Sequence, residues 1–270
     1  MIHGLSLLKY NNRMLYKNKK LLISLLFFLS CFILSKYISA YPINDKLLLF
    51  SYVRGIPLAK GEVLIKLKKN KYSVKVDAHS VGLFSIVLDW RQTIKSFGKI
   101  ENNKFISFRY RSSDFRGKKN GHMEIDFKNI LPNIISAQPD PREDDRRTMS
   151  DSFLLKTNDP VAGIFNLALE QCNNTVKVFD GKRRYNIKII KKEVSVLDDS
   201  YLGENAVETI KCNYEIERIA GYTKKELEKF PKKGKIWIKK HSKFSFFYPV
   251  KIQIKTNWGK FLCYTKERRI

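Results

Sequence analysis

The segment from Lys224 to Lys243 combines basic and aromatic side chains in a pattern that suits the binding of a polyanion. Its candidate binding residues are Lys232, Lys233, Lys235, Trp237, Lys239 and Lys240. The N-terminal residues, described below, predict export across an inner membrane. The polyanions available there are anionic lipid head groups, lipopolysaccharide and acidic glycans, whereas nucleic acid is not an expected partner. Lysine is abundant throughout the chain, whose formal net charge is +26. The same segment therefore also fits an ordinary solvated surface.

Signatures of catalysis and of cofactor binding are missing from the sequence. It contains no G-x-G-x-x-G, P-loop, H-E-x-x-H, G-x-S-x-G or C-x-x-C motif. His79, His122 and His241 lie far apart without ligand-like spacing, so neither a metal nor a cofactor is expected. Two carboxylates, or a histidine with a nucleophile, meeting in a cleft near Asp89, Asp180 or His122 would instead indicate a hydrolase. The sequence leaves enzymatic activity open and favours a protein without it.

Three cysteines follow residue 40, an odd count that permits at most one disulfide and one leftover thiol. Cys172 follows a predicted helix, and Cys212 lies on the apolar face of a predicted strand. A bridge between them would close a loop of about 40 residues and contribute about 4 kcal/mol in the chain-entropy model. Two independent buried thiols are the alternative, and only an oxidising compartment favours the bridge. Cys263 fits a small apolar residue on the last strand.

The stretch from Gln138 to Ser150 is the strongest internal boundary, because Pro139 and Pro141 interrupt strand pairing there. Its acidic residues are Asp140, Glu143, Asp144 and Asp145. They suggest a Ca2+ site, but three arginines interspersed among them favour a solvated loop with ion pairs. We expect this loop to separate two halves of one sheet.

Residues 1–40 have the pattern of an export signal. Six basic residues and no acid occur there, and an uncharged apolar run extends from Leu21 to Ser35. That run is too short for a bilayer span of about 20 residues and suits the core of a signal peptide. Cleavage after Ala40 would release residues 41–270 into an oxidising compartment, whereas an uncleaved membrane anchor would keep them tethered there. The expected location is the periplasm, either free or anchored to the inner membrane.

The remainder of the chain is predicted to be a series of short strands around one core. A hydrophobic fraction of 43% excludes wholesale disorder. Residues 72–78 alternate apolar and polar side chains, the period of a strand with one buried face. Similar segments lie near 47–53, 61–68, 90–98, 105–111, 123–127, 185–189, 207–216, 235–240 and 249–264. Short connections with turn residues predict antiparallel pairing. We therefore expect a mostly β (α+β) fold, in which residues 41–270 form one curved antiparallel sheet or partial barrel.

Two segments depart from strand periodicity. Asp159 is placed to cap a helix whose first residue is Pro160, and apolar residues then recur at helical spacing. We predict a helix from about 160 to 171 that covers the concave face of the sheet, because its apolar stripe needs a partner. The run Val81–Leu88 is apolar without alternation and fits either a buried strand or a short helical turn.

Asp180-Gly181 is a turn signal between two alternating segments, so a hairpin is predicted with its tip at these residues. Asp180 would alternatively form an ion pair with Arg183 or Arg184 and so shape a site. The two interpretations are compatible.

Several segments, taken in order, resemble the bacterial domain of unknown function 3108 family. They are Val81-Gly82-Leu83 with Asp89-Trp90-Arg91, residues 140–147, Asp159-Pro160-Val161, Phe179-Asp180-Gly181-Lys182-Arg183-Arg184-Tyr185, Ala220-Gly221-Tyr222, and Trp237 with Tyr248-Pro249-Val250-Lys251. The resemblance spans most of residues 45–265, and the run from Phe179 to Tyr185 is its sharpest element. It implies an exported, β-rich protein of a Gram-negative envelope without an assigned activity, and it transfers no catalytic residue. Cys172 and Cys212 also resemble the paired cysteines of some members, which strengthens the expectation of a bridge.

Together these observations favour an exported envelope protein that binds a hydrophobic or anionic envelope component or a partner protein without catalysing a reaction. A partly closed sheet with apolar walls would hold an acyl chain, by analogy with envelope lipid carriers. The alternatives are a hydrolase of an envelope polymer and a structural or assembly protein that pairs through a sheet edge. Pocket lining discriminates among them, since a deep apolar cavity favours lipid and a shallow polar cleft favours chemistry.

Overall fold

A computed structural model describes residues 43–146, 149–198, 206–242, 246–256 and 259–267. The export signal predicted for residues 1–40 lies outside these ranges, as does Lys243, the last residue of the lysine-rich segment. Within the described ranges, no helix has the length and apolar character needed to cross a membrane.

The first half of the sheet is a meander of seven strands, each paired antiparallel with the next. Its elements are β1 (Ile43–Val53), β2 (Ile56–Lys68), β3 (Lys71–Ser80), α2 (Gly82–Val87), β4 (Trp90–Glu101), β5 (Lys104–Arg116), β6 (Lys119–Asp126) and β7 (Asn133–Gln138). The predicted alternation appears in β3, where Tyr72 and Val74 are buried and Ser73 is only half-buried. Successive side chains of a strand point to opposite faces, so one face of β3 lines the core.

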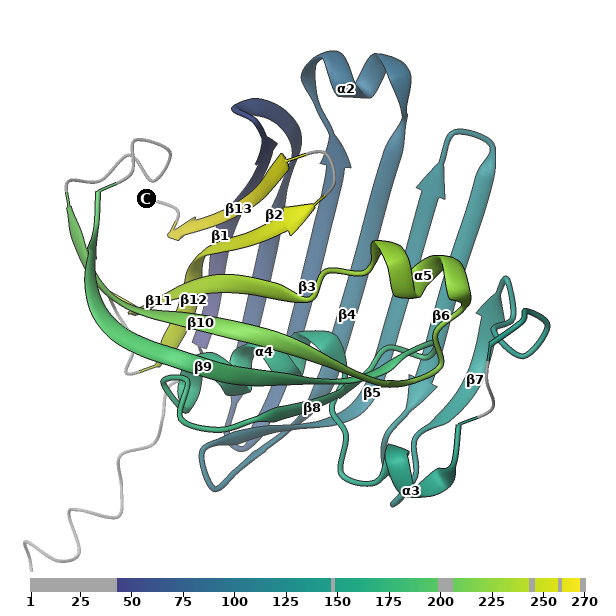
Figure 1. Cartoon of the computed structure of the whole chain (residues 1–270). Helices are drawn as coiled ribbons and strands as arrows, with labels where there is room; N and C mark the ends of the chain where they lie inside the picture. Colours follow the sequence, from purple (N-terminus) through teal and green to yellow (C-terminus); the bar gives the residue numbers. More distant parts are fainter. Residues whose placement is uncertain (1–42, 147–148, 199–205, 243–245, 257–258, 268–270) are drawn as a thin grey trace, which may run out of the picture. The chain divides into compact units, whose positions relative to one another are not determined.

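The second half is a meander of six strands that joins the first through β13 and β1. Its elements are β8 (Val176–Phe179), β9 (Arg184–Leu197), β10 (Val207–Ala220), α5 (Lys224–Lys229), β11 (Lys233–Lys240), β12 (Phe247–Thr256) and β13 (Gly259–Glu267). The described strands thus form one antiparallel sheet of thirteen, with β7 and β8 at its edges (Figure 1). This confirms the predicted fold class, although about ten strands were expected and β7 was missed.

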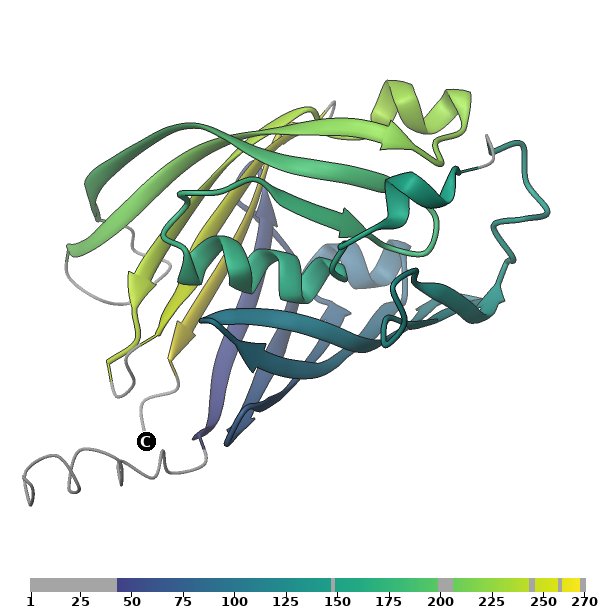
Figure 2. The same cartoon turned by 90° about the horizontal axis from the view of Figure 1, so that it is seen from below.

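The loop from β7 carries the chain to the other edge of the sheet, through α3 (Asp151–Leu154) and α4 (Pro160–Leu169). Figure 2 shows α4 lying between the two halves of the curled sheet, as the sequence predicted. The Asp159 side chain caps α4 by accepting hydrogen bonds from Val161 N and Ala162 N. Asn166 then pins the helix to β5, since its amide exchanges two hydrogen bonds with the backbone of Phe105.

The helix α4 divides the core into two clusters. On one side Phe165 stacks on Phe105 of β5, with ring centroids 5.4 Å apart. On the other side Leu167 packs with residues of β8, β10 and β11. The predicted disulfide between Cys172 and Cys212 is present in this second cluster, where it links the end of the α4 segment to β10. Burial of both faces of α4 explains why its apolar residues extend around most of the helix.

The run Val81–Leu88 contains the short helix α2, the helical alternative of the two that the sequence left open. Its residues are not buried, because the helix forms the tip of the β3–β4 hairpin. Leu83, Ile86 and Val87 are 74%, 81% and 84% exposed. The apolar character of this run therefore does not reflect core packing.

Candidate functional site

The turn between β8 and β9 is held by Asp180. The Oδ1 atom of Asp180 accepts hydrogen bonds from the backbone N–H groups of Lys182 (2.9 Å) and Arg183 (2.7 Å). Its Oδ2 atom accepts one from Nε of Arg183 at 2.9 Å and lies 2.8 Å from Nη2. The hairpin and the ion pair anticipated from the sequence therefore coexist. Arg184 takes no part in this pair and donates to the backbone oxygen of Phe153.

Arg183 connects this turn to an aromatic cluster. Its guanidinium lies 4.6 Å from the ring centroid of Phe230, which contacts Tyr185 and Tyr222 at centroid distances of 5.7 and 5.3 Å. A cation stacked on an aromatic face is stabilised most where water is excluded. Burial alone would lower the pKa of Arg183, but Asp180 raises it above its ordinary value. Arg183 is therefore a fixed positive charge at the turn.

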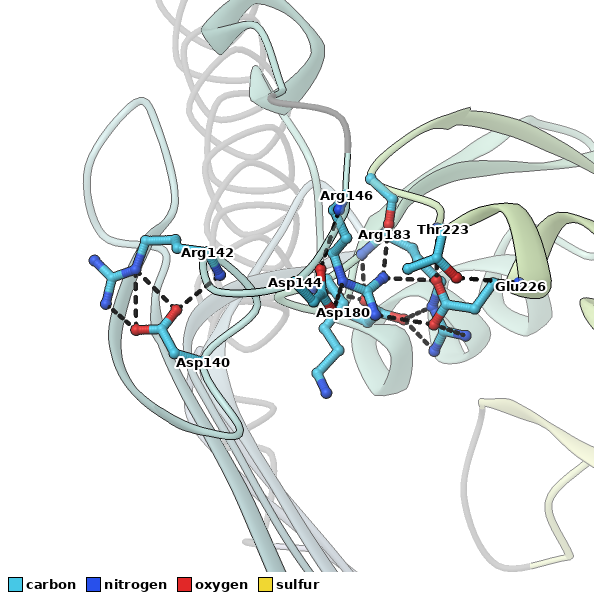
Figure 3. Close-up of polar contacts among 10 residues, drawn as sticks. Asp140, Arg142, Asp144, Arg146, Asp180, Arg183, Thr223 and Glu226 are labelled. Atoms are coloured by element: carbon cyan, nitrogen blue, oxygen red, sulfur yellow. Dashed lines mark hydrogen bonds and ion pairs between the residues drawn. The ribbon is translucent and has the colours of Figure 1, made fainter.

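A second arginine, Arg146, ties the loop after β7 to α5 (Figure 3). Its Nη1 and Nη2 atoms donate to the two carboxylate oxygens of Glu226 at 2.7 and 3.1 Å, and Nη1 also donates to the backbone oxygen of Gly221 at 2.8 Å. Thr223 and Glu226 form a capping box that orients the carboxylate. Burial alone would raise the pKa of Glu226, but hydrogen bonds from Arg146 and Thr223 lower it below its ordinary value.

Glycines allow these segments to approach closely. Gly221 has a φ of 77°, and a Cβ on it would lie 2.1 Å from the backbone oxygen of Lys182. Gly181 has a φ of 90°, and its Cβ would lie 2.4 Å from the sulfur of Met123. Gly221 needs glycine for conformation and for space, because backbone blocks its Cβ, whereas Gly181 needs glycine for conformation and meets only the flexible Met123 side chain. Three family-like segments, residues 140–146, the β8–β9 turn and residues 220–222, thus converge at one place.

An open pocket of about 410 Å³ lies between the β8–β9 turn and strands β4 to β6, and we call it the turn pocket. Its lining residues are Gln92, Tyr110, Ser112, Asp114, Arg116, Lys119, Asn120, Gly121, His122, Met123, Gln138, Pro139, Asp180, Lys182 and Arg183. Most of these side chains carry hydrogen-bond donors or acceptors. The turn pocket is therefore an open polar cleft and not a deep apolar cavity. By the criterion given above, this lining argues against an acyl-chain ligand and keeps a hydrolase as an alternative.

Four cationic and two acidic side chains line the turn pocket. Arg183 pairs with Asp180, and Nε of Arg116 lies 2.9 Å from Oδ2 of Asp114. Lys119 and Lys182 have no acidic partner among the residues that the structure describes. The turn pocket therefore holds two ammonium groups whose charge no described carboxylate offsets, an arrangement that suits a ligand with one or two negative charges.

The turn pocket also contains groups typical of acid–base catalysis, namely Asp114, Asp180 and His122. Both oxygens of Asp180 accept hydrogen bonds within the turn, and Oδ2 of Asp114 is paired with Arg116, so three of the four carboxylate oxygens already have cationic or N–H partners. The geometry therefore fits binding better than proton transfer.

A second open pocket, of about 380 Å³, lies beside the same turn and shares Lys182 with the turn pocket. Arg142 lines it, and hydrogen bonds from Arg142 lower the pKa of Asp140 to about 2. Asp144 likewise lies 2.7 Å from Nε of Arg146. The 138–150 loop thus carries the ion pairs that the sequence favoured over a Ca2+ site, and no cluster suited to a metal ion occurs within the described ranges.

Asp159 forms a separate cluster beneath α4. It is 0% exposed, and its Oδ2 atom accepts hydrogen bonds from the hydroxyls of Ser96 on β4 and Ser107 on β5, both at 2.7 Å. The Ser96 hydroxyl also lies 3.2 Å from that of Tyr72. Burial raises the pKa of Asp159, although these hydrogen bonds act in the opposite direction. Asp159 and its neighbour Pro160 thus position α4 on the sheet and do not line the turn pocket.

Two other groups of sequence-predicted residues lie outside the turn pocket. Asp89 and Arg91 form an exposed ion pair at the start of β4, with 3.0 Å between Oδ2 and Nη2, and the Trp90 backbone donates to Ser80. In the lysine-rich segment, Trp237 is only 7% exposed. The lysines of that segment are Lys232, which precedes β11, and Lys233, Lys235, Lys239 and Lys240 on β11. Their role in anion binding stays a prediction.

Sequence reasoning missed Lys119, Arg146 and Glu226 as members of this region. Arg146 and Glu226 lie 80 positions apart, so no local pattern links them. Thr223-x-x-Glu226 is a capping-box pattern that would have indicated α5, in a segment interpreted only by its lysines.

Comparisons with known proteins give a family and a distant structural likeness. No curated protein matches the chain. The model of a family described as "Protein of unknown function (DUF3108)" matches residues 49–264. Among solved structures, a β-barrel-like protein of the domain of unknown function DUF1849 from Brucella abortus is similar over 84% of this chain and 97% of its own, with 8% identity and a TM-score of 0.45.

Proposed function

The chain belongs to the DUF3108 family, whose function is unknown, and on that premise we propose from the turn pocket that it binds an acidic glycan or sugar head group of the cell envelope. The ligand bears phosphate or carboxylate groups and is bound without chemical change. The observation that carries this proposal is the pair of ammonium groups, Lys119 and Lys182, for which the described part of the chain offers no acidic partner.

The rest of the lining suits a sugar. Gln92, Asn120 and Gln138 supply amide groups, and Tyr110 and Ser112 supply hydroxyls, which can donate to or accept from sugar hydroxyl groups. Asp180 fixes the turn that carries Lys182 before any ligand arrives. A preformed turn loses little conformational freedom on binding, so more of the interaction energy appears as affinity.

Export supports a ligand from the envelope. Residues 1–40 have the signal pattern described above, and the Cys172–Cys212 disulfide is of the kind that persists in oxidising compartments. We propose a periplasmic location on these grounds, with residues 1–40 either removed or retained as an anchor.

The other binding modes have less support. The helix α4 occupies the concave side of the sheet, where an acyl chain was envisaged (Figure 2). Assembly through a sheet edge is disfavoured because β7 and β8 span only six and four residues, and short edge strands offer little backbone for pairing.

Calorimetric titration of the full chain with a hexose 1-phosphate at low ionic strength tests the proposal. We expect saturable binding that weakens with added salt, and no binding of the neutral hexose. Lys119→Ala and Lys182→Ala should each weaken binding at least about tenfold, because a hydrogen bond to a charged group contributes about 1.5–3 kcal/mol. Lys71→Ala is the matched control, since Lys71 is exposed at the β2–β3 turn outside the pocket. Equal affinities for all three variants, or no binding, would refute the proposal.

Hydrolysis of an envelope polymer is a second candidate, because Asp114, Asp180 and His122 line the same pocket. It predicts release of soluble sugar from isolated envelope polymer by the wild type. Asp114→Asn should abolish that release if the carboxylate acts on the substrate, and unaltered polymer after incubation with the wild type would argue against this candidate.

A further inference from the structure

The tip of the β3–β4 hairpin presents an apolar helix face to solvent. Leu83, Ile86 and Val87 of α2 are 74%, 81% and 84% exposed. Because they occupy positions i, i+3 and i+4, the three side chains lie on one face of the helix. Figure 1 shows α2 beyond the ends of β3 and β4.

This exposure belongs to an ordered element. The backbone N–H of Leu88 donates to Phe84 O at 2.9 Å, and the hydroxyl of Ser85 donates to Gly82 O at 2.7 Å. A further hydrogen bond, from the backbone N–H of Val81 to the backbone oxygen of Leu58 on β2 (3.0 Å), attaches the tip to the sheet. The apolar face is therefore held outward by the fold, and such exposed apolar faces mark interaction sites.

Basic side chains surround the same end of the sheet. The β5–β6 turn is tied to the segment after α2, since the backbone N–H of Gly117 donates to Asp89 O at 2.8 Å. The β1–β2 turn lies at this end too, because consecutive strands run antiparallel. The exposed basic residues of these turns are Arg54, Arg91, Arg116, Lys118 and Lys119. Two acids, Asp89 and Asp114, offset only Arg91 and Arg116. A net positive charge therefore flanks the apolar tip.

We propose that α2 is a membrane-contact tip, which inserts Leu83, Ile86 and Val87 shallowly into a bilayer containing anionic lipids. The flanking basic residues then lie at the level of the head groups, where each gains from the negative surface potential. The surface of three side chains is far smaller than the area of about 800 Å² per partner that a stable protein–protein interface buries. They suit an apolar wedge at the bilayer interface, where apolar burial and attraction to anionic lipids act together. The proposal is independent of the ligand of the turn pocket.

Fluorescence quenching at position 86 tests this contact. The full chain carrying Ile86→Trp is mixed with vesicles of phosphatidylethanolamine and phosphatidylglycerol that contain brominated acyl chains, and the wild-type signal is subtracted. Ile130→Trp is the matched control, because Ile130 is 82% exposed and follows β6 at the opposite end of the sheet. We expect quenching of Trp at position 86 to exceed that at position 130 severalfold. The probe reports on one residue, so contact of residues 1–40 with lipid does not alter the comparison.

Charge and self-association complete the test. Arg54→Glu with Lys118→Glu should raise the lipid concentration needed for half-maximal quenching at position 86 at least about thirtyfold, because each basic residue lost near an anionic surface removes about 1 kcal/mol. Phosphatidylcholine vesicles should likewise weaken the quenching. Equal quenching at positions 86 and 130, or none at 86, would overturn the proposal. A blue shift of the position-86 signal that grows with protein concentration without vesicles would assign the tip to a second copy of the chain and also overturn it.

Discussion

Replacement of Asp159 by alanine should destabilise the protein by about 3 kcal/mol. The carboxylate caps α4 and also accepts the hydroxyls of Ser96 and Ser107. Loss of an N-cap costs about 1 kcal/mol. The two serines are 0% and 2% exposed, and each buried hydroxyl that loses its acceptor costs about 1 kcal/mol or more. The loss of the cap and the loss of the two serine contacts add to about 3 kcal/mol, because all three hold α4 between the two halves of the core.

Asp159→Asn distinguishes the effect of the Asp159 charge on stability from the effect of its capping hydrogen bonds. Asparagine retains an oxygen for the two backbone N–H groups and lacks the carboxyl proton. Burial raises the pKa of Asp159 above its ordinary value of 3.8, so the folded state binds this proton more tightly than the unfolded chain. The resulting stability is complete below the unfolded pKa and is lost as the pH rises through the folded pKa. The free energy of unfolding of the wild type, relative to Asp159→Asn, should therefore fall between acidic and neutral pH.

Urea unfolding followed by circular dichroism at pH 4 and pH 7 measures both effects. Thr223→Ala is the control, because it removes the cap of α5, a helix without buried residues, and should cost about 1 kcal/mol or less. A cost for Asp159→Ala no larger than that of Thr223→Ala would show that the serine contacts add nothing. A wild-type advantage over Asp159→Asn that grew with pH would refute the direction of the pKa shift.

Two further substitutions test the packing. Gly221→Ala should cost about 3 kcal/mol, because a left-handed φ costs about 1–2 kcal/mol and the new Cβ would meet the backbone oxygen of Lys182. Gly55→Ala is the control, because Gly55 has a φ of 82° and nothing lies within 4 Å of its added Cβ, so only the cost of the left-handed φ should remain. Equal decreases in the free energy of unfolding, measured in urea, for Gly221→Ala and Gly55→Ala would contradict the packing argument. Removal of the disulfide by Cys172→Ala with Cys212→Ala should lower the free energy of unfolding by about 4 kcal/mol, and an unchanged urea midpoint would show that the bridge adds no stability.

Local patterns predicted the elements that local interactions determine. Alternation predicted β3, and the sequence Asp159-Pro160 predicted the start of α4 at the correct residue. The edge strand β7 was missed because it is short and holds two consecutive isoleucines, Ile134 and Ile135, which break the alternation. Short edge strands take much of their stability from the neighbouring strand, so their own residues carry a weak signal.

Contacts between segments that are distant in sequence could not be predicted from local sequence patterns. The turn at Asp180 was predicted with its ion pair, but the pocket beside it also needs Arg116 and Lys119, which belong to another hairpin. Hydrophobicity alone could not show whether the run Val81–Leu88 packs inward or outward, because only the position of the hairpin tip decides this.

The pairing of β1 with β13 sets an order for folding. Within each meander, neighbours in sequence are neighbours in the sheet, so their hairpins close short loops and form early. The seam between the meanders joins the first and last described strands, and it forms only when both are present. Until then β1 offers an unpaired edge of eleven residues to any other extended chain. A truncation that removed β13 would therefore open the sheet at its middle and create an aggregation-prone seam.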